Sequence, residues 1–324
     1  MNIPKVSVII PAYNAMSYLP ETLETVFNQS FKDFEVVVVN DGSTDNIEEW
    51  ISQISDPRVK LVSQANLGVS EARNNGIAKS QGEYIAFLDT DDLWKSTKLA
   101  RQVRVLDNYP EVGLVYTWVT YIDERGNSTG RVVNYQYEGN VWQELTKGNL
   151  IECGSVAMVR RQCFEECGVF DGNFVGNFVE DWDMWLRIAK TYPFKVIEEP
   201  LVYYRQVTNS ASSNWQAMAK GYQLVIDKAF AAASWNELPL RNRSYGVANL
   251  VLAWKVIQSQ ARDARQAKYF RSQALRHDPW LICSKEYLRL SVAIAIMSWF
   301  GANGYNKFLS LLYTLRRRTV SLSR

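Results

Sequence analysis

Histidine and cysteine are scarce in this chain, which has one histidine and four cysteines among its 324 residues. Cys153, Cys163, Cys167 and Cys283 lack C-x-x-C spacing, and His277 is far along the chain from the first three. Structural zinc sites and disulfide frameworks both depend on such spacings. We therefore expect neither, and we interpret the cysteines as reduced thiols of a cytoplasmic protein.

Long apolar runs are missing as well. The longest, at 290–302, has 13 residues, whereas a helix needs about 20 to span a bilayer. The first residues also lack the basic stretch and apolar segment of a signal peptide. We therefore expect a cytoplasmic protein with no membrane span.

No glycine-rich phosphate loop follows any predicted strand. A G-x-G-x-x-G sequence is absent, and the residues after the first predicted strand are PAYNAMS. Dehydrogenases bind their dinucleotide through such a loop. The absence argues against a dehydrogenase. It also disfavours an enzyme that makes nucleotide sugars, which we keep as an alternative.

Acidic and basic residues are unevenly distributed along the chain. Residues 213–324 carry 17 Lys or Arg against 5 Asp or Glu, while residues 1–212 carry 19 against 29. Such an imbalance indicates an anionic partner for the second part. The basic residues could bind an anionic membrane surface, or they could simply be solvated on a packed helical region. No recognised motif supports nucleic acid as the partner. The basic residues that flank the apolar runs of this part are Lys285, Arg289, Lys307, Arg316, Arg317 and Arg318.

Strands and helices alternate over the first 90 residues. Apolar runs of strand length are separated by segments of helical period, an order that predicts a parallel sheet with ligands at the carboxyl ends of its strands. The predicted strands of this part are 6–10, 34–40, 59–62 and 84–88, and the predicted helices are 21–29 and 69–79.

Further along the chain the pattern changes. Strands are predicted at 113–121, 156–159, 194–197 and 201–204, and helices at 97–108, 161–167 and 182–190. Beyond residue 209 only helical periodicity remains, at 222–233, 245–260, 262–276 and 285–300. We therefore expect an α/β domain at 1–212 and a basic α-helical region at 213–324.

Three aspartates, Asp89, Asp91 and Asp92, follow the fourth predicted strand within four residues. Like charges so close together repel one another unless a cation lies between them. Carboxylate oxygens select hard cations such as Mg²⁺ or Mn²⁺. We therefore expect a divalent metal held by these three residues, with an acidic helix-capping turn as the alternative.

Five sequence stretches occur in a fixed order: VSVIIPAYN, VVVVNDGSTD, NLGVSEARNNGI, GEYIAFLDTDD and VEDWDMWLRIA. Together they resemble family 2 glycosyltransferases of the GT-A fold, over about residues 4–212. The resemblance implies a Rossmann-like, mostly parallel sheet that binds a nucleotide diphosphate sugar, with the α-helical region as a C-terminal extension.

The resemblance also implies roles at matching positions. It makes Asp89 and Asp91 the D-x-D motif, with Asp91 the direct ligand of Mn²⁺ or Mg²⁺, while Asp92 binds the metal or the donor sugar. The nucleotide-binding residues that it implies are Pro11, Ala12, Tyr13, Asp41, Arg73, Asp89 and Thr90.

Asp181 matches the family's catalytic base, which removes the proton of the acceptor hydroxyl during an inverting transfer. A plain helix cap is the alternative for this residue. We assign contacts with the acceptor to Ser155, Glu180 and Trp182, although a tryptophan on a helix also suits a core position.

The sequence departs from the family at two places. Processive members carry Q-x-x-R-W shortly after the base, whereas the nearest match here, at 273–277, comes far later and has no tryptophan. Many relatives also have a histidine after the pair that is Tyr204-Arg205 here, and this chain has Val207 near that place. We therefore expect a single transfer, and a metal that relies on the donor diphosphate and water.

The expected activity is transfer of one sugar from a nucleotide diphosphate sugar, UDP first among the nucleotides, to a saccharide or lipid-linked acceptor. The setting would be cell-surface polysaccharide or glycolipid assembly in the cytoplasm, with attachment to the inner face of the membrane left open. A catalytically silent nucleotide-sugar-binding scaffold and a nucleotide-sugar pyrophosphorylase remain as alternatives.

Overall fold

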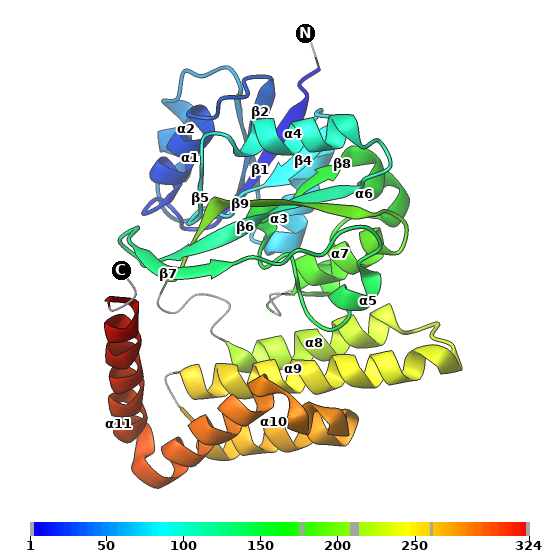
Figure 1. The fold of residues 1–324 in the computed structure, drawn as a ribbon. Coiled ribbons are helices and arrows are strands. Elements are labelled where there is room, and N and C mark those ends of the chain that lie inside the picture. The colour runs from blue at the N-terminus through cyan, green and yellow to red at the C-terminus, as the bar shows by residue number, and fades with distance from the viewer. Residues whose placement is uncertain (1–2, 175, 177–178, 208–213, 260–261, 322–324) are drawn as a thin grey trace. The chain divides into compact units, whose positions relative to one another are not determined.

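The structure of this chain is a computed structural model that describes residues 3–174, 176, 179–207, 214–259 and 262–321. Side chains are described up to residue 301 within these ranges, and at Gly304 and Tyr305. Two compact units form, Met1–Ala211 and Ser212–Arg324 (Figure 1). Each has a hydrophobic core of its own, as separately packed domains do.

The first unit is built on one mixed sheet. Its strands lie in the order β3-β2-β1-β4-β8-β6-β9-β5, and β7 pairs with β6. The strands are β1 Val6–Ala12, β2 Phe34–Asp41, β3 Val59–Gln64, β4 Tyr84–Phe87, β5 Leu93–Trp94, β6 Leu114–Ile122, β7 Ser128–Val133, β8 Met158–Arg160 and β9 Phe194–Arg205.

The first four strands run parallel to one another. β1, β2 and β4 are almost wholly buried, which agrees with their uninterrupted apolar sequences, because a parallel sheet is covered on both faces. Pairing of Ala12 with Asn40 and of Ile9 with Phe87 brings the carboxyl ends of these three strands to one edge. The expected α/β fold is confirmed, and the sequence motifs that follow these strands meet at this edge.

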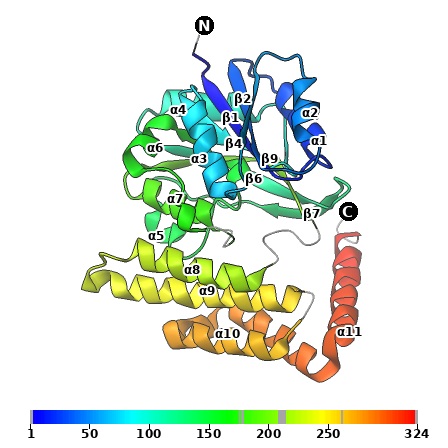
Figure 2. The same cartoon turned by 180° about the vertical axis from the view of Figure 1, so that it is seen from behind.

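Helices cover both faces of the sheet, as two opposite views show (Figures 1 and 2). Gly76 lets α3 lie close to β1, since a Cβ atom there would come within 2.4 Å of Ile9 Cγ2. Arg73, one turn earlier on α3, is thereby held against the sheet. The helices and 3-10 turns of this unit are α1 Leu19–Phe27, α2 Ile47–Ser52, α3 Val69–Lys79, α4 Lys98–Asn108, α5 Trp142–Leu145, η1 Gly154–Val156, α6 Arg161–Cys167, η2 Gly172–Phe174 and α7 Glu180–Ala189.

The second half of the sheet differs in detail from the sequence prediction. β9 is one strand rather than two, because Pro200 lies where the pairing with β6 shifts its register beside Trp118, and such irregularities tolerate proline. The strand predicted at 156–159 shortens to β8, since Val156 belongs to η1. β8 runs antiparallel to both β4 and β6, so the sheet is mixed. β5 has two residues, too few for a periodic signal.

The second unit contains only helices and turns among its described residues. α9 and α10 pack against one another through small side chains such as Ala253, Ala267 and Ala274, all fully buried. The helices and 3-10 turns are α8 Trp215–Ala229, η4 Trp235–Glu237, α9 Leu238–Gln258, α10 Ala264–His277, η5 Pro279–Cys283 and α11 Lys285–Ser321.

The last helix, α11, is interrupted at Gly301, where φ is 66°. Such a positive φ favours glycine and breaks the helical hydrogen-bond pattern. No helix in the described part of the chain is long and apolar enough to cross a membrane. The side chains of four basic residues that the sequence analysis singled out, Lys307, Arg316, Arg317 and Arg318, lie outside the described part of the structure.

Candidate active site

The carboxyl end of β1 carries the first expected nucleotide-binding residues, Pro11, Ala12 and Tyr13. Ala12 is buried, whereas Tyr13 is 52% exposed. Asn14 follows with φ 48°, and its Oδ1 accepts hydrogen bonds from the Thr44 amide at 2.7 Å and the Thr44 hydroxyl at 3.2 Å. These bonds tie the turn after β1 to the turn after β2, and they leave the Tyr13 side chain exposed at the sheet edge.

Asp41, the last residue of β2, is 4% exposed. Its carboxylate accepts hydrogen bonds from the amides of Leu67 and Gly68 at 2.9 Å each and from Gln64 Nε2 at 2.8 Å. Gly68 is the N-cap of α3 and has φ 90°, a conformation that favours glycine. Asp41 therefore fixes the start of the helix that carries Arg73.

The three aspartates after β4 lie in different surroundings. Asp89 is partly exposed and accepts a hydrogen bond from Arg73 Nη2 at 2.9 Å. Burial and then the neighbouring Asp89 raise the pKa of the half-buried Asp91 to about 6. Asp92 is fully buried, and the Ser155 hydroxyl donates to its Oδ2 at 2.6 Å. Burial, followed by repulsion from Asp91 and Asp89, raises the pKa of Asp92 well above its usual value.

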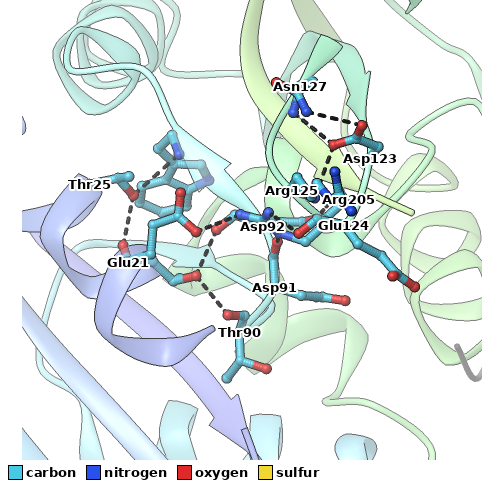
Figure 3. A network of polar contacts seen from close by, with 12 residues as sticks. Glu21, Thr25, Thr90, Asp91, Asp92, Asp123, Glu124, Arg125, Asn127 and Arg205 are labelled. Carbon is cyan, nitrogen blue, oxygen red and sulfur yellow. Dashed lines mark hydrogen bonds and ion pairs between the residues drawn. The ribbon is translucent and has the colours of Figure 1, made fainter. Parts of the chain in front are cut away.

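Arg205, the last residue of β9, fastens this acid turn, defined here as residues 89–92 (Figure 3). Its side chain is 2% exposed. Its Nε donates to the Asp91 carbonyl at 2.9 Å, and its backbone amide donates to Asp92 Oδ1 at 3.1 Å. Its Nη1 and Nη2 donate to the Glu124 carbonyl at 3.0 Å and to the Glu21 carboxylate at 2.7 Å. The acid turn is therefore joined to α1 and to the β6–β7 hairpin.

Thr90 is held in the turn through its backbone. Its carbonyl accepts a hydrogen bond from the Thr22 hydroxyl on α1 at 2.6 Å, and the same hydroxyl donates to the Asp92 carbonyl at 3.0 Å. With the bond from Arg205, three consecutive carbonyls of the turn have partners. The backbone that presents Asp89 and Asp91 is thus fixed before any ligand binds, which favours binding.

Arg73 lies between the acid turn and the start of α7 and is 3% exposed. Its Nη1 donates to Glu180 Oε1 at 2.5 Å, and its Nη2 donates to Asp89. Burial alone would lower the pKa of the guanidinium, but Asp89, Glu180 and Asp181 raise it above its usual value. Among the described residues, Arg73 Nε and Glu180 Oε2 are buried without a hydrogen-bond partner. Buried polar atoms of this kind are rare and suit a ligand contact.

Asp181 lies in the first turn of α7, whose N-cap is Val179. Its Oδ2 accepts a hydrogen bond from Asn149 Nδ2 at 3.2 Å. Burial, followed by repulsion from Glu180, raises its pKa to about 7, and Arg73 partly offsets this. A helix start would by itself favour the ionised form. Burial outweighs that effect, so the carboxyl group suits proton transfer near neutral pH.

Ser155, Glu180 and Trp182, which the sequence assigns to the acceptor, all have buried side chains. The Ser155 hydroxyl is bonded to Asp92, and the Trp182 indole donates to the Leu145 carbonyl at 2.7 Å. Glu180 forms the ion pair with the guanidinium described above. Glu180 and Trp182 on α7 and Ser155 in η1 thus face the interior of the structure, and their contacts with an acceptor stay a prediction.

The carboxylates of Asp89 and Asp91 fit a hard divalent cation. Burial and then repulsion from Asp89 raise the pKa of Asp91, and a bound cation would favour the charged form of both carboxylates. Asp92, expected as a third ligand, has both carboxylate oxygens engaged inside the protein. Within the described ranges, no three Asp, Glu, His or Cys side chains gather closely enough to hold a metal by themselves. A metal at this place would take two carboxylates and fill its other positions with donor phosphates and water.

No motif marks several of the supporting residues. Arg205 gives a sequence signal only as a charged residue at the end of an apolar strand, and Asn149 lies in a loop without periodicity. Asn74 does lie in the stretch NLGVSEARNNGI, but its two hydrogen bonds of 2.9 Å with the backbone of Phe170 give no signal in the sequence. These contacts join segments that are distant in sequence, so their partners could not be read from the chain.

Comparison with known proteins identifies the family of this chain. Residues 7–168 match the family model described as Glycosyl transferase family 2. A Bacillus subtilis protein provisionally named a teichuronic acid biosynthesis glycosyltransferase is 31% identical over 72% of this chain and 92% of that protein. An uncharacterized glycosyltransferase of Methanocaldococcus jannaschii is 32% identical over 63% of this chain and 72% of that protein. A third, from Rickettsia bellii, is 35% identical over 57% of this chain but only 26% of its own greater length.

Two solved structures share the fold. Residues 1–349 of S. aureus TarS in complex with UDP-GlcNAc give a TM-score of 0.55 at 17% identity, covering 84% of this chain and 89% of that one. Mannosyltransferase PcManGT of Pyrobaculum calidifontis, in complex with GDP-Man and Mn²⁺, gives 0.55 at 21% identity, covering 94% and 87%. The family match and this shared architecture agree with the motifs found in the sequence: the chain belongs to glycosyltransferase family 2 and is a glycosyltransferase of the GT-A fold.

Proposed function

We propose that this glycosyltransferase moves a single sugar from a nucleotide diphosphate sugar, with UDP as the first candidate nucleotide, onto an acceptor hydroxyl with inversion. One observation carries the proposal. Asp181 has a pKa raised to about 7. It interacts electrostatically with the buried Arg73, which in turn forms an ion pair with Asp89 of the acid turn. Such a transfer would need a general base and a phosphate-binding region in the same site.

The donor nucleotide would lie over the carboxyl ends of β1, β2 and β4, the edge where sheets of this kind bind ligands. Tyr13 offers an exposed ring on which the nucleobase would stack, and Pro11 and Ala12 form the strand end beside it. Asp41 fixes the loop that leads to Arg73 and would border the ribose or the uracil. Together these residues would make the nucleoside pocket.

The diphosphate would lie between Arg73 and the acid turn. Mn²⁺ or Mg²⁺, held by Asp91 and Asp89 beside Thr90, is the cofactor that we propose. Bound there, the ion would neutralise negative charge on the leaving diphosphate. The Mn²⁺ in the complex of the Pyrobaculum mannosyltransferase supports this choice.

Asp181 would act as the general base. As the acceptor oxygen bonds to the anomeric carbon, its proton moves to the carboxylate, and on the opposite face the bond from that carbon to the diphosphate oxygen breaks. The Asn149 amide, 3.2 Å from Oδ2, would hold the carboxylate in position. A pKa of about 7 keeps the base strong while a large fraction is still deprotonated at neutral pH.

The acceptor that we propose is a saccharide or a lipid-linked saccharide, in cell-surface polysaccharide or glycolipid assembly. The name of the Bacillus subtilis relative supports such a setting. The absence of Q-x-x-R-W shortly after the base supports one transfer per acceptor rather than polymerisation.

We also propose that the enzyme works in the cytoplasm, peripherally bound to an anionic membrane surface through α11. Leu288, Val292 and Trp299 recur on one side of this helix and are 55%, 53% and 78% exposed. Lys285 and Arg289 are exposed in its first turns. Basic helices with an exposed apolar side bind the interface of anionic bilayers.

Asp181→Asn tests the base, with Glu165→Gln, an exposed carboxylate on α6, as its control. We expect donor binding close to wild type and transfer reduced by roughly 10²–10⁴-fold, the usual effect of losing a general base. The readout is nucleoside diphosphate released from UDP-sugars with Mn²⁺, with added saccharides or water as the acceptor. Undiminished release in Asp181→Asn would place the base elsewhere. Nucleotide binding without any turnover in wild type would favour the silent scaffold. Formation of UTP and a sugar 1-phosphate when pyrophosphate is added in place of the acceptor would favour a pyrophosphorylase.

A further inference from the structure

A groove of about 520 Å³ opens on the surface of the helical unit. It lies where η4 and the start of α9 meet the end of α10 and η5. Two tryptophans, Trp235 and Trp280, line it together with a polar group formed by Asn242, Arg243 and Asp278. Nothing in the proposed transfer at the sheet edge uses these residues.

The two tryptophans are unusually exposed. Trp235 is 87% and Trp280 is 80% exposed, although tryptophan is highly buried on average. Exposed aromatic surface that is gathered in one place generally marks a binding site. A flat indole face presents apolar surface with little conformational freedom, which suits stacking on the C–H face of a ring.

The backbone beneath each ring is fixed. Trp235 begins a 3-10 turn closed by a capping box, in which the Ser234 hydroxyl accepts from the Glu237 amide and the Ser234 amide donates to the Glu237 carboxylate at 2.8 Å. The Ser234 hydroxyl also lies 3.0 Å from that carboxylate. Trp280 lies in η5, and its amide donates to Asp278 Oδ1 at 3.1 Å. Both rings are therefore carried on short, pre-formed turns, so that less ordering is needed when a ligand binds.

The polar group has balanced charge. Arg243 Nη1 donates to Asp278 Oδ2 at 2.7 Å, and Asp278 is 6% exposed. His277 stacks on Tyr245 with ring centroids 4.9 Å apart. The exposed Arg243 guanidinium and Asn242 amide offer donors and an acceptor to hydroxyl groups, and the pairing with Asp278 balances the charge of the arginine.

Close packing keeps this arrangement in place. Gly246 lies one turn after Arg243 on α9, and a Cβ atom there would come within 2.9 Å of Asp278 Cβ and 2.8 Å of Leu281 Cδ1. The glycine therefore lets α9 approach η5 closely enough for the ion pair to form. The polar side of the groove is therefore held by close packing between α9 and η5.

We propose that this groove binds a neutral saccharide chain, with Trp235 and Trp280 stacking on sugar rings and with the exposed Asn242 and Arg243, the latter held by Asp278, meeting their hydroxyl groups. Saccharide rings combine an apolar face with a rim of hydroxyls, and the groove offers the matching aromatic and polar surfaces. The binding itself is independent of catalysis. Its role, holding part of the acceptor away from the reacting hydroxyl, rests on the proposed function.

A lipid surface fits the groove less well. Membrane-binding segments surround apolar side chains with unpaired cations, whereas the arginine here is neutralised by Asp278. An anionic chain is disfavoured for the same reason. Burial and the nearby Arg241 also lower the pKa of His277, which leaves its imidazole neutral at physiological pH.

The experiment titrates the full chain with neutral hexasaccharides of glucose, mannose and N-acetylglucosamine, following tryptophan fluorescence and calorimetry. Trp235→Ala and Trp280→Ala are the test variants, and Trp299→Ala, equally exposed on α11, is the control. We expect at least one hexasaccharide to bind at millimolar concentration or below, with little dependence on salt. Each test variant should weaken it by about tenfold, the value of one stacked ring, and Trp299→Ala should not.

Three outcomes would overturn the inference: no binding by any neutral hexasaccharide, equal binding by the test variants, or binding of hexagalacturonate alone with strong salt dependence. Loss of binding to anionic vesicles in the two test variants, without any saccharide binding, would assign the groove to a membrane instead. Stabilisation of the same samples by a nucleoside diphosphate with Mn²⁺ is measured in parallel. If this stabilisation is observed while saccharide binding is not, the inference about the groove is wrong but the proposed function still stands.

Discussion

The ionisation of one carboxyl group, Asp181, governs when the proposed site can act. Burial is the main reason that its pKa is raised to about 7, repulsion from Glu180 adds to the shift, and Arg73 opposes it. A carboxylate with the ordinary pKa of an exposed aspartate would be ionised but weakly basic at neutral pH. The surroundings of Asp181 therefore trade some ionisation for greater basicity, as general bases require.

The pH dependence of the reaction follows from this value. We expect kcat/KM to rise as the pH increases through about 7 and then to level off, because only the deprotonated form can accept a proton. The measurement is donor turnover at saturating Mn²⁺ and constant ionic strength, and Asp181→Asn should lack this rise. A wild-type profile that is already level well below pH 7 would contradict the raised pKa.

The same group should lower the stability of the free protein in alkaline solution. The ordinary aspartate pKa is 3.8, and between that value and about 7 the folded state holds a proton that the unfolded state has lost. Stability therefore falls as the pH rises through this range. We expect Asp181→Asn to raise the melting temperature above pH 7 and to bring no gain near pH 4.

The matched control for this stability test lies on the same helix. Asp183 accepts a hydrogen bond from Arg187 Nε at 2.9 Å, so Asp183→Asn removes a favourable contact and should lower the melting temperature above pH 7. Thermal unfolding without metal or nucleotide supplies both comparisons. Equal melting temperatures for Asp181→Asn and wild type above pH 7 would show that the carboxylate carries no such cost.

At the scale of secondary structure, the acid turn follows β4 but is held by elements distant from it in sequence. Arg205 at the end of β9 bonds the Asp91 carbonyl and the Asp92 carboxylate, and its guanidinium also reaches Glu21 on α1 and the Glu124 carbonyl (Figure 3). Arg205 thus connects the acid turn to α1, to the β6–β7 hairpin and to its own strand β9. These contacts make Arg205 a candidate positioning residue for the aspartates of the acid turn.

Arg205→Gln tests that role. It leaves the Glu21 carboxylate and the backbone carbonyls of Asp91 and Glu124 without the Arg205 donor. Breaking a buried ion pair costs about 3–5 kcal/mol, an upper figure here because Glu21 is half exposed. We expect lower stability and a larger metal concentration for half-maximal turnover, measured by thermal unfolding and Mn²⁺ titration. Arg101→Gln is the control, since its ion pair with Glu199 is exposed and 3.5 Å long. An unchanged Mn²⁺ requirement in Arg205→Gln would mean that the turn is held without it.

Much of the fold could be predicted, because its signals are local. Buried parallel strands such as β1 and β2 are uninterrupted apolar runs, and α6 follows its predicted range of 161–167. The sequence predicts two strands, at 194–197 and 201–204, where the structure has the single strand β9. The register shift with β6 at Pro200 that joins them cannot be read from one strand alone. The two-residue β5 exists only through its pairing with β9.

The position of the site could also be predicted, but not the direction of each side chain. Acids after β2 and β4 had to meet at one edge, since parallel strands end together. That Asp92 turns inward depends on the Arg205 amide and the Ser155 hydroxyl, both far away in sequence. The burial of Trp182 likewise depends on the Leu145 carbonyl. Contacts of this kind are properties of the folded chain.

At the scale of the whole molecule, the excess of positive charge lies in the second part of the chain, with 17 Lys or Arg against 5 Asp or Glu among residues 213–324. The two units have separate cores. This separation is consistent with one unit that carries the chemistry and a second that brings the enzyme to its acceptor. The exposed apolar side of α11 and the tryptophan groove would serve that second task in different ways.

Membrane association can be tested by flotation with vesicles that contain anionic lipid. Replacing Leu288 and Val292 together by glutamine should abolish flotation, because burying each apolar side chain in the interface contributes about 1.5–3 kcal/mol. Leu224→Gln, which changes an exposed leucine on α8, should leave flotation unchanged. Equal flotation of all three proteins would exclude α11 as the membrane-binding element.

The proposed function depends on binding of a nucleoside diphosphate with a divalent metal at the sheet edge. The most direct measurement is a thermal-shift panel of UDP, GDP, dTDP and CMP, each with and without Mn²⁺, since a ligand that binds the folded state raises the melting temperature. We predict stabilisation by one diphosphate, UDP first among them, that requires Mn²⁺ and is lost in Asp91→Ala. A folded sample that no nucleotide stabilises, or one stabilised equally in Asp91→Ala, would contradict the account.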